Sequence, residues 1–196
     1  MTITEIDFQI ISKVYKWEKV GLQNVHAFSK GYLPKPIIES ILDLYEKKTT
    51  LKGVEGEEVE YLLSKGMLNS AYGMCVTDVV KDNSVYNETW EIEKVNIDDK
   101  ITEYNSSTNR FLYYAWGIYV TAYARRNLWT GILSVGGDYV YSDTDSIKCV
   151  NFDNHSSYVK RYNQTIQNKL ELMCEHYNLD KTRLTPKTIE GVEKPL

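Results

Sequence analysis

The chain has 196 residues and a formal net charge of −4, and it is long enough to bury a core as one domain or two small ones. It has no apolar run near the roughly 18 to 20 residues that cross a bilayer and no basic-then-apolar leader, so we expect a soluble, cytoplasmic protein. The negative charge excludes a generally basic domain, and nucleic-acid binding would need a local basic stripe. Three widely spaced cysteines without a C-x-x-C pair argue against a disulfide framework and a structural zinc site.

Apolar periodicity predicts three helices in the first part of the chain. The first covers residues 5–19, on a 4-4-3 spacing of apolar side chains, and residues 22–28 are predicted to form a short strand. A second, amphipathic helix covers residues 37–48, and a third covers residues 57–72 with Gly73 as its C-cap. The second and third helices predict an αα-hairpin with a lysine-bearing tip.

The remainder of the chain predicts hairpins that alternate with helices. Residues 78–109 are rich in Asp, Asn, Ser and Thr and are interpreted as an inserted β-hairpin. A helix over residues 110–133 is apolar on most sides, which predicts burial. A β-hairpin with an acidic apex (138–150) and a helix (157–177) follow, and residues 187–196 are interpreted as the start of a further element. The predicted fold class is therefore α+β.

The acidic apex contains the first candidate site, Asp143-x-Asp145. Carboxylates at i and i+2 of an extended segment point to the same side, so Asp143 and Asp145 could face one Mg²⁺ ion. A single pair is insufficient, because such sites take further carboxylates or substrate phosphates. Two alternatives stay open: a solvated hairpin turn, and a phosphatase whose nucleophilic Asp opens a D-x-D at the end of a buried strand.

The third predicted helix aligns Lys65, Asn69 and Tyr72 at positions i, i+4 and i+7. This face could bind a nucleotide, with the lysine on a phosphate and the tyrosine against a sugar or base. The alternative is a solvated helix lysine beside a half-buried tyrosine.

Thr121 and Arg125 share one side of the long apolar helix. A charged residue on such a helix needs a partner, and the candidates are a carboxylate of the acidic hairpin or a nucleic-acid phosphate. The alternative is a buried structural ion pair.

Taken together, three segments resemble the ordered signature motifs of family B DNA polymerases, and most closely those of the protein-primed subfamily of bacteriophages and linear plasmids. The segments are Lys65-x-x-x-Asn69-Ser70-x-Tyr72-Gly73, Thr121-x-x-Ala124-Arg125 and Tyr141-x-Asp143-Thr144-Asp145-Ser146. The resemblance covers essentially the whole chain, but the chain covers only part of a polymerase. It implies αα-hairpin fingers and part of a palm, with an antiparallel sheet and packed helices.

The resemblance implies a role for each matching residue. Catalysis and metal binding fall to Asp145, with Asp143 as a secondary participant. Nucleotide binding falls to Lys65, Asn69 and Tyr72, with a further triphosphate lysine at Lys48 or Lys52. Contacts with the primer and template fall to Thr121, Arg125 and Tyr141. The implied chemistry is attack of a primer 3′-hydroxyl on a dNTP, with two Mg²⁺ ions, or Mn²⁺ in their place, stabilising the reacting oxygens.

The resemblance also implies boundaries and partners. Residues 1–34 would end the insertion that precedes the fingers, residues 35–76 would form the fingers, residues 77–109 a β-hairpin insertion within the palm, and residues 110–196 the C-terminal part of the palm. The partners would be primer–template DNA, dNTPs and, in a full-length parent, a terminal protein primer, in the cytoplasm of a bacterial host and without a membrane.

Several features of the family are missing, among them the acidic motifs of a 3′–5′ exonuclease and the downstream Lys-x-Tyr segment that leads into the thumb. The upstream Asp-x-x-Ser-Leu-Tyr-Pro segment, which supplies another metal aspartate, has no counterpart here. We therefore expect the isolated chain to bind Mg²⁺ weakly and not to polymerise DNA. The alternative function is a non-catalytic fragment that binds DNA or a partner protein.

Overall fold

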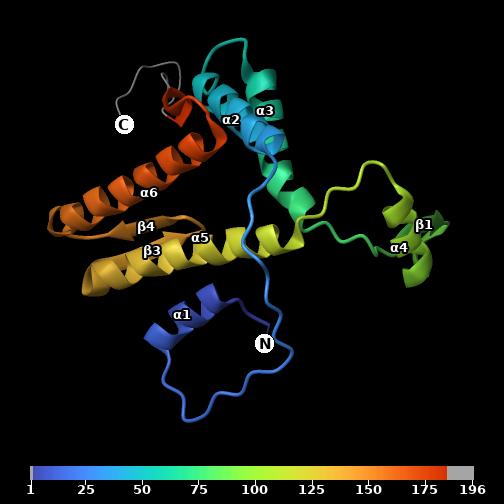
Figure 1. Cartoon of the computed structure of the whole chain (residues 1–196), viewed down its shortest axis with the longest axis horizontal. Helices are drawn as coiled ribbons and strands as arrows, with labels where there is room; N and C mark the ends of the chain where they lie inside the picture. The colour runs from blue at the N-terminus through green and yellow to red at the C-terminus, as the bar shows by residue number, and fades with distance from the viewer. Residues whose placement is uncertain (1, 185–196) are drawn as a thin grey trace.

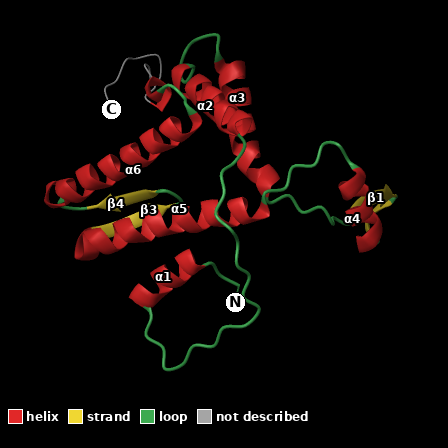
Figure 2. Ribbon diagram, viewed as in Figure 1, coloured by secondary structure: helices red, strands yellow, loops and turns green. Residues whose placement is uncertain are grey.

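The computed structural model describes residues 2–184 (Figure 1), so the element predicted for residues 187–196 lies outside the described part. Six α-helices and four β-strands are described: α1 (Glu5–Val14), α2 (Lys35–Thr50), α3 (Glu58–Cys75), β1 (Asn83–Asn87), β2 (Thr89–Glu93), α4 (Ile97–Ser106), α5 (Tyr114–Val135), β3 (Tyr139–Asp143), β4 (Ser146–Cys149) and α6 (Ser156–Tyr177). The strands form two separate antiparallel hairpins, β1–β2 and β3–β4, among the helices (Figure 2). The α+β class is therefore confirmed.

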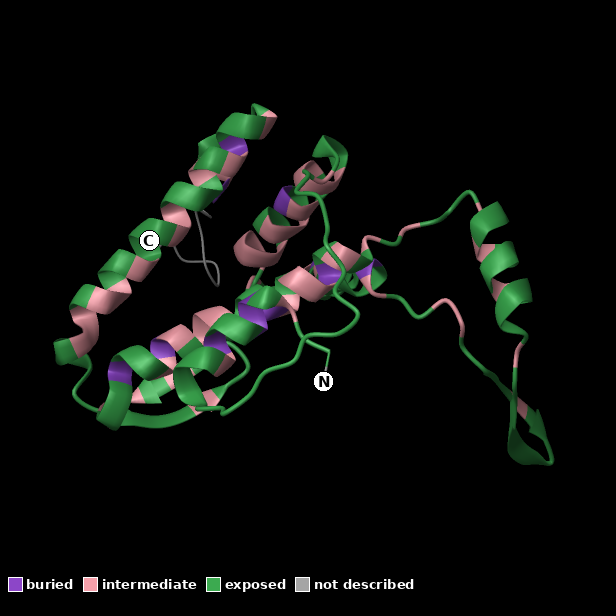
Figure 3. Cartoon of the chain, turned by 60° about the horizontal axis from the view of Figure 1, so that its bottom comes forward, coloured by how far each residue is buried: buried purple, intermediate pink, exposed green. Residues whose placement is uncertain are grey.

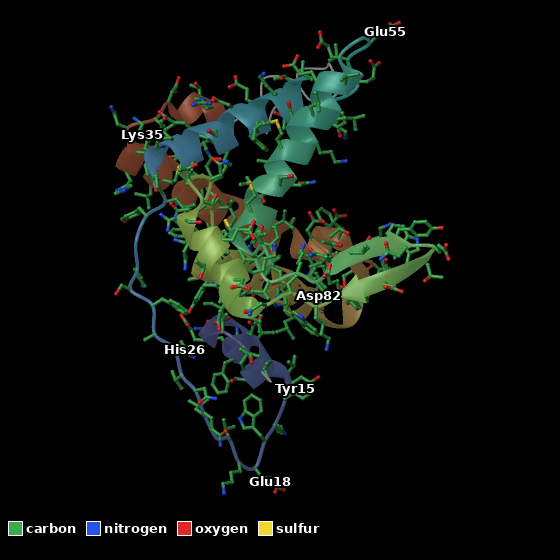
Figure 4. The ribbon with its side chains drawn as sticks, turned by 90° about the vertical axis from the view of Figure 1, so that its right-hand side faces the viewer. Tyr15, Glu18, His26, Lys35, Glu55 and Asp82 are labelled. Atoms are coloured by element: carbon green, nitrogen blue, oxygen red, sulfur yellow. The ribbon has the colours of Figure 1, made fainter. Side chains whose placement is uncertain are left out.

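The first helix is shorter than predicted. Thr4 and Asp7 form a capping box at its start, and α1 ends at Val14. Trp17, which the spacing had included in the helix, instead stacks on Phe8 with 5.5 Å between ring centroids. The strand predicted for residues 22–28 is also wrong: that segment pairs with no strand among residues 2–184 and belongs to the long connection marked at Tyr15, Glu18 and His26 in Figure 4.

The αα-hairpin is confirmed. Helix α2 begins after Pro34, α3 packs antiparallel beside it, and Lys47 Nζ lies 2.8 Å from Glu60 Oε1 between the two helices. Gly73 is not the C-cap. The helix continues to Cys75 because Gly73 keeps an ordinary negative φ, and Val76 ends it instead.

The insertion contains more than a hairpin. The predicted β-hairpin is present as β1 and β2, and Figure 1 shows it extending away from the main group of helices together with α4. Helix α4 was not predicted. Its signal was local: the Asn96 side chain accepts hydrogen bonds from the backbone N–H groups of Asp98 and Asp99, at 2.9 and 3.4 Å.

Helix α5 is the central element, since α1, α3 and β4 all contact it. It begins at Tyr114 rather than residue 110, and it is less buried than predicted (Figure 3). Its buried residues are Gly117, Ala122, Gly131 and Val135. Several large apolar side chains of the same helix are exposed, namely Val120, Tyr123 and Leu133.

A small core fixes α6 to the α2–α3 hairpin. Leu42 of α2, Cys174 of α6 and Leu184 are buried together, and Arg183 forms ion pairs with Asp43 and Glu46 of α2. At the other end of α6, the His155 ring bonds Asp138 at 2.8 Å, which ties the helix start to the base of the β3–β4 hairpin. Among the described residues, no helix combines the length and apolarity needed to cross a membrane.

Candidate nucleotide and metal site

The predicted acidic apex is present. Asp143 pairs with Ser146 at the end of the β3–β4 ladder, which leaves Thr144 and Asp145 as a two-residue loop. Two-residue hairpin loops require a positive φ at their first position, and Thr144 has φ 49°. Because a β-branched residue rarely adopts this conformation, the loop is strained at the position between the two carboxylates.

Hydrogen bonds hold Asp143 more firmly than Asp145. Thr144 Oγ1 donates to Asp143 Oδ1 at 3.0 Å, and Ser146 Oγ donates to the Asp143 carbonyl at 3.1 Å. Both carboxylates are solvent-exposed. The strand that carries Asp143 is itself mostly exposed, which removes the buried strand that the phosphatase alternative requires.

Carboxylates are ligands that a hard cation prefers, but Asp145 lies in the turn and not in an extended segment, so the predicted alignment of Asp143 and Asp145 on one side of a strand is not present. Within residues 2–184, no group of three or more His, Cys, Asp or Glu side chains could hold a metal ion. Two carboxylates leave most of an octahedral Mg²⁺ shell to water or to substrate phosphates. The residues present therefore fit a Mg²⁺ ion that arrives with a nucleotide better than a resident one.

Two glycines on α5 allow neighbouring elements to approach closely. A Cβ on Gly117 would lie 2.2 Å from Val76 Cγ1, at the end of α3, and one on Gly131 would lie 2.3 Å from Ile147 Cδ1, on β4. Their separation of fourteen positions along the sequence corresponds to about 21 Å of helix. Helix α5 therefore joins the helix that carries Lys65, Asn69 and Tyr72 to the hairpin that carries Asp143 and Asp145.

The hairpin apex is directed towards the middle of α5. Figure 1 shows β3 running back along α5, and Ile147 of β4 contacts Gly131. Asp145 precedes Ile147 by two residues, about 7 Å of extended chain, or about five residues of the neighbouring helix. The acidic apex therefore lies beside the part of α5 that follows Arg125.

The side chains of the α3 face are exposed. Lys65, Asn69 and Tyr72 are all accessible, and Tyr72 is 39% exposed. Lys65 Nζ lies 5.9 Å from the ring centroid of Tyr61, and within the described residues it forms no ion pair with a carboxylate. This ammonium can therefore bind an added phosphate.

The candidate lysine at the tip of the α2–α3 hairpin is not brought to this face. Lys52 lies in the loop between α2 and α3, the tip marked by Glu55 in Figure 4. Tyr72 lies near the opposite end of α3, about 20 Å away by helical rise alone. Lys52 and Tyr72 therefore do not share one site in this structure.

Arg125 has a carboxylate partner that differs from the one expected on the acidic hairpin. Its Nε lies 2.8 Å from Asp7 Oδ1 and its Nη2 lies 3.1 Å from Asp7 Oδ2, a two-point contact between α5 and α1. The guanidinium holds the pKa of Asp7 below its usual range, and the same hydrogen bond raises the pKa of Arg125. The phenol of Tyr72 adds a smaller effect on Arg125 in the same direction, which places two of the motifs in one neighbourhood.

The other predicted DNA contacts have local partners. The Thr121 hydroxyl donates to the Ile118 carbonyl of its own helix at 2.9 Å. Tyr141 pairs with Lys148 across the hairpin and is 53% exposed. Thr121 and Arg125 lie on neighbouring turns of α5, whereas Tyr141 belongs to the hairpin beside it.

Comparison with known proteins gave no match: no family model, no curated protein and no solved structure is similar to this chain.

Sequence reasoning did not identify Asp7 as part of this site. Asp7 and Arg125 are 118 positions apart, and neither helix carries a pattern that specifies the other as its partner. The available signal was limited to Thr4 and Asp7, whose spacing fits a capping box at the start of a helix.

Proposed function

We propose that this chain is part of a template-directed DNA polymerase of family B, similar to the protein-primed enzymes, and that it contributes the fingers and the C-terminal part of the palm. One observation carries the proposal. Helix α5 contacts α3 at Gly117 and β4 at Gly131. The α3 face with Lys65, the α5 face with Arg125 and the acidic apex therefore belong to one continuous unit.

Each group has a chemical task in this proposal. Lys65 binds the triphosphate, Asn69 and Tyr72 contact the base and sugar, and Arg125 binds a phosphate of the primer–template. Asp145, with Asp143 beside it, holds Mg²⁺, or Mn²⁺ in its place. When bound, the metal stabilises charge on the attacking and leaving oxygens of phosphoryl transfer. A third carboxylate is required for activity, and within residues 2–184 none lies beside this pair.

The test measures binding before activity. The chain is titrated with a fluorescent dNTP analogue in Mn²⁺ and, separately, with a labelled primer–template duplex. Lys65→Ala is expected to weaken nucleotide binding about tenfold, with Lys100→Ala on α4, whose ammonium pairs with Glu103, as the matched control. Arg125→Ala is expected to weaken duplex binding, with the adjacent Arg126→Ala as its control, because Arg126 packs on the Tyr123 ring instead.

Primer extension with Mg²⁺ or Mn²⁺, beside an Asp145→Asn control, completes the test. The proposal expects no extension by the chain alone. Extension that disappears in Asp145→Asn would show that the carboxylate set is complete. Equal binding by each variant and its control would contradict the proposal.

A second candidate is a binding fragment that grips DNA or a partner without chemistry. The observation that favours it is the pair of carboxylates without a third among the described residues. Duplex binding that depends on Arg125, combined with the absence of nucleotide binding at Lys65, would select this candidate.

A further inference from the structure

The contact between Asp7 and Arg125 leaves a free edge on the guanidinium. Arginine has five N–H donors, and Asp7 accepts one from Nε and one from Nη2. Both donors of Nη1 and the second donor of Nη2 have no acceptor in the part of the chain that the structure describes. These form the fork that binds a phosphate through two parallel hydrogen bonds.

Burial is divided unequally between the two side chains. The Arg125 side chain is 51% exposed, whereas that of Asp7 is only 12% exposed. The carboxylate is therefore the buried partner of the pair, and about half of the arginine side chain is accessible to solvent and to a bound anion. An arginine that is held by a buried carboxylate and is itself accessible can bind an anion from solvent.

Asp7 is itself held in place. Its Oδ2 accepts hydrogen bonds from the Thr4 backbone N–H at 3.2 Å and from the Thr4 hydroxyl at 2.9 Å. Buried Ile6 and Ile10 lie on the same helix, which packs against α5. A second tie joins the two helices, since the Tyr119 hydroxyl donates to Glu5 Oε2 at 2.5 Å. The carboxylate thus has little freedom to follow a moving arginine.

We infer that Asp7 is a positioning residue that holds the Arg125 guanidinium with its Nη1–Nη2 edge facing a strand phosphate of bound DNA. The inference rests on the proposed function, and it adds a residue that lies outside the three motifs. Without Asp7 the long side chain samples many rotamers, and fixing it on binding costs affinity.

Orientation and charge predict opposite results, which makes the inference testable. Asp7→Asn removes a negative charge near the DNA, and charge alone would strengthen binding. Loss of orientation would weaken it. We expect Asp7→Asn to bind a labelled primer–template duplex about fivefold more weakly than the parent chain, by fluorescence anisotropy. Glu91→Gln, an exposed position on β2 with the same change in charge, should bind at least as tightly as the parent.

Salt dependence provides a readout that a merely structural role would not change. If Arg125 loses its phosphate contact, the slope of log K against log salt should fall by about one in Asp7→Asn, as in Arg125→Ala. The double variant should then resemble Arg125→Ala alone. Asp7→Glu, which keeps a carboxylate, should recover part of the affinity. A titration with a dNTP alone tests whether Arg125 binds a free triphosphate instead of a phosphate of the DNA strand.

Arg125→Lys keeps Asp7 and tests the inference even if the Asp7 variants fail to fold. Lysine has no second edge, so this variant should bind duplex as weakly as Arg125→Ala. Two results would overturn the inference and leave the proposed function standing. One is that Arg125→Lys binds duplex as tightly as the parent chain. The other is that Asp7→Asn binds at least as tightly as the parent while Arg125→Ala binds weakly. Unchanged binding by Arg125→Ala would remove the proposed DNA contact, and the inference with it.

Discussion

Gly117 of α5 lies directly against Val76, because a Cβ at residue 117 would lie 2.2 Å from Val76 Cγ1. Cβ of Cys75 lies 3.2 Å from the same position. Because a branched valine next to the α3 terminus cannot withdraw easily, only glycine permits this approach. The contact determines how the α3 face is placed relative to Arg125.

We expect Gly117→Ala to lower the free energy of unfolding by about 1 to 3 kcal/mol, because the overlap with Val76 exceeds the gain of about 1 kcal/mol from the better helix former. Gly131→Ala is the matched comparison. There the nearest atom is Ile147 Cδ1, the end of a flexible side chain, so the change should stay within about 1 kcal/mol. Urea unfolding measures both, and equal losses would contradict the difference in packing.

The Asp7 ion pair predicts a pH-dependent stability. The pKa of Asp7 is lowered in the folded chain, first through its hydrogen bond with Arg125, from a reference value of 3.8. Because folding lowers this pKa, ionised Asp7 stabilises the fold at pH values above its pKa in the unfolded chain. This stabilisation is lost as the pH falls through the pKa of Asp7 in the folded chain. Asp7→Asn should therefore cost about 1 to 3 kcal/mol at pH 7, and this difference should shrink below about pH 4.

Urea unfolding of the parent and Asp7→Asn at pH 7, 5 and 3 checks this prediction. The Glu91→Gln variant serves as the control, because its side chain is exposed on the isolated β1–β2 hairpin. A loss in Asp7→Asn that is the same at all three pH values would show that the ion pair does not provide the stabilisation.

Local sequence patterns predicted much of this fold. The features that were not predicted depend on contacts between residues far apart in the sequence. The αα-hairpin and the acidic hairpin follow from helical and alternating periodicity, which are local properties. The over-extended first helix shows the limit, since Trp17 continues the apolar spacing but packs on Phe8 from outside the helix. In the candidate site, the aligned face of α3 and the apex carboxylates were predictable, whereas the Asp7–Arg125 pair depends on how α1 and α5 pack.

The cysteines should differ in reactivity. Cys174 has no exposed surface and Cys75 is 8% exposed, and burial raises the pKa of both thiols. Cys149 on β4 is more accessible. Since the thiolate is the reactive form, a disulfide reagent at pH 8 should modify about one thiol quickly and the other two only on unfolding. Cys149→Ser should remove the fast phase, and a fast phase that persists in this variant would contradict the burial of the other two.

The core between α2 and α6 should be sensitive to truncation. Leu42 is 6% exposed and packs with Cys174 and Leu184. Leu42→Ala should lower the free energy of unfolding by about 2 to 5 kcal/mol. Leu172→Ala, on the same helix as Cys174 but 63% exposed, is the control and should change it little. A comparable loss in both variants would show that Leu42 does not belong to a core that fixes α6.

The strained backbone at Thr144 should affect the position of the Asp143 carboxylate more than the stability of the fold. A threonine with φ 49° is strained, and glycine adopts this conformation without a steric penalty. Glycine also makes the unfolded chain more flexible, which offsets part of the gain. We expect Thr144→Gly to change the free energy of unfolding by less than about 1 kcal/mol, while it removes the hydrogen bond from Thr144 Oγ1 to Asp143 Oδ1.

The functional effect of Thr144→Gly should be larger than its effect on stability, because the strained threonine restrains the carboxylate that precedes it. Binding of a fluorescent dNTP analogue in Mn²⁺ should weaken several-fold in Thr144→Gly. Thr130→Gly is not a suitable comparison because it would weaken α5, so Thr108→Gly, outside the helices and strands, is the matched control. If Thr144→Gly binds the nucleotide as the parent does, the geometry at residue 144 does not contribute to the site, and the carboxylates act without its restraint.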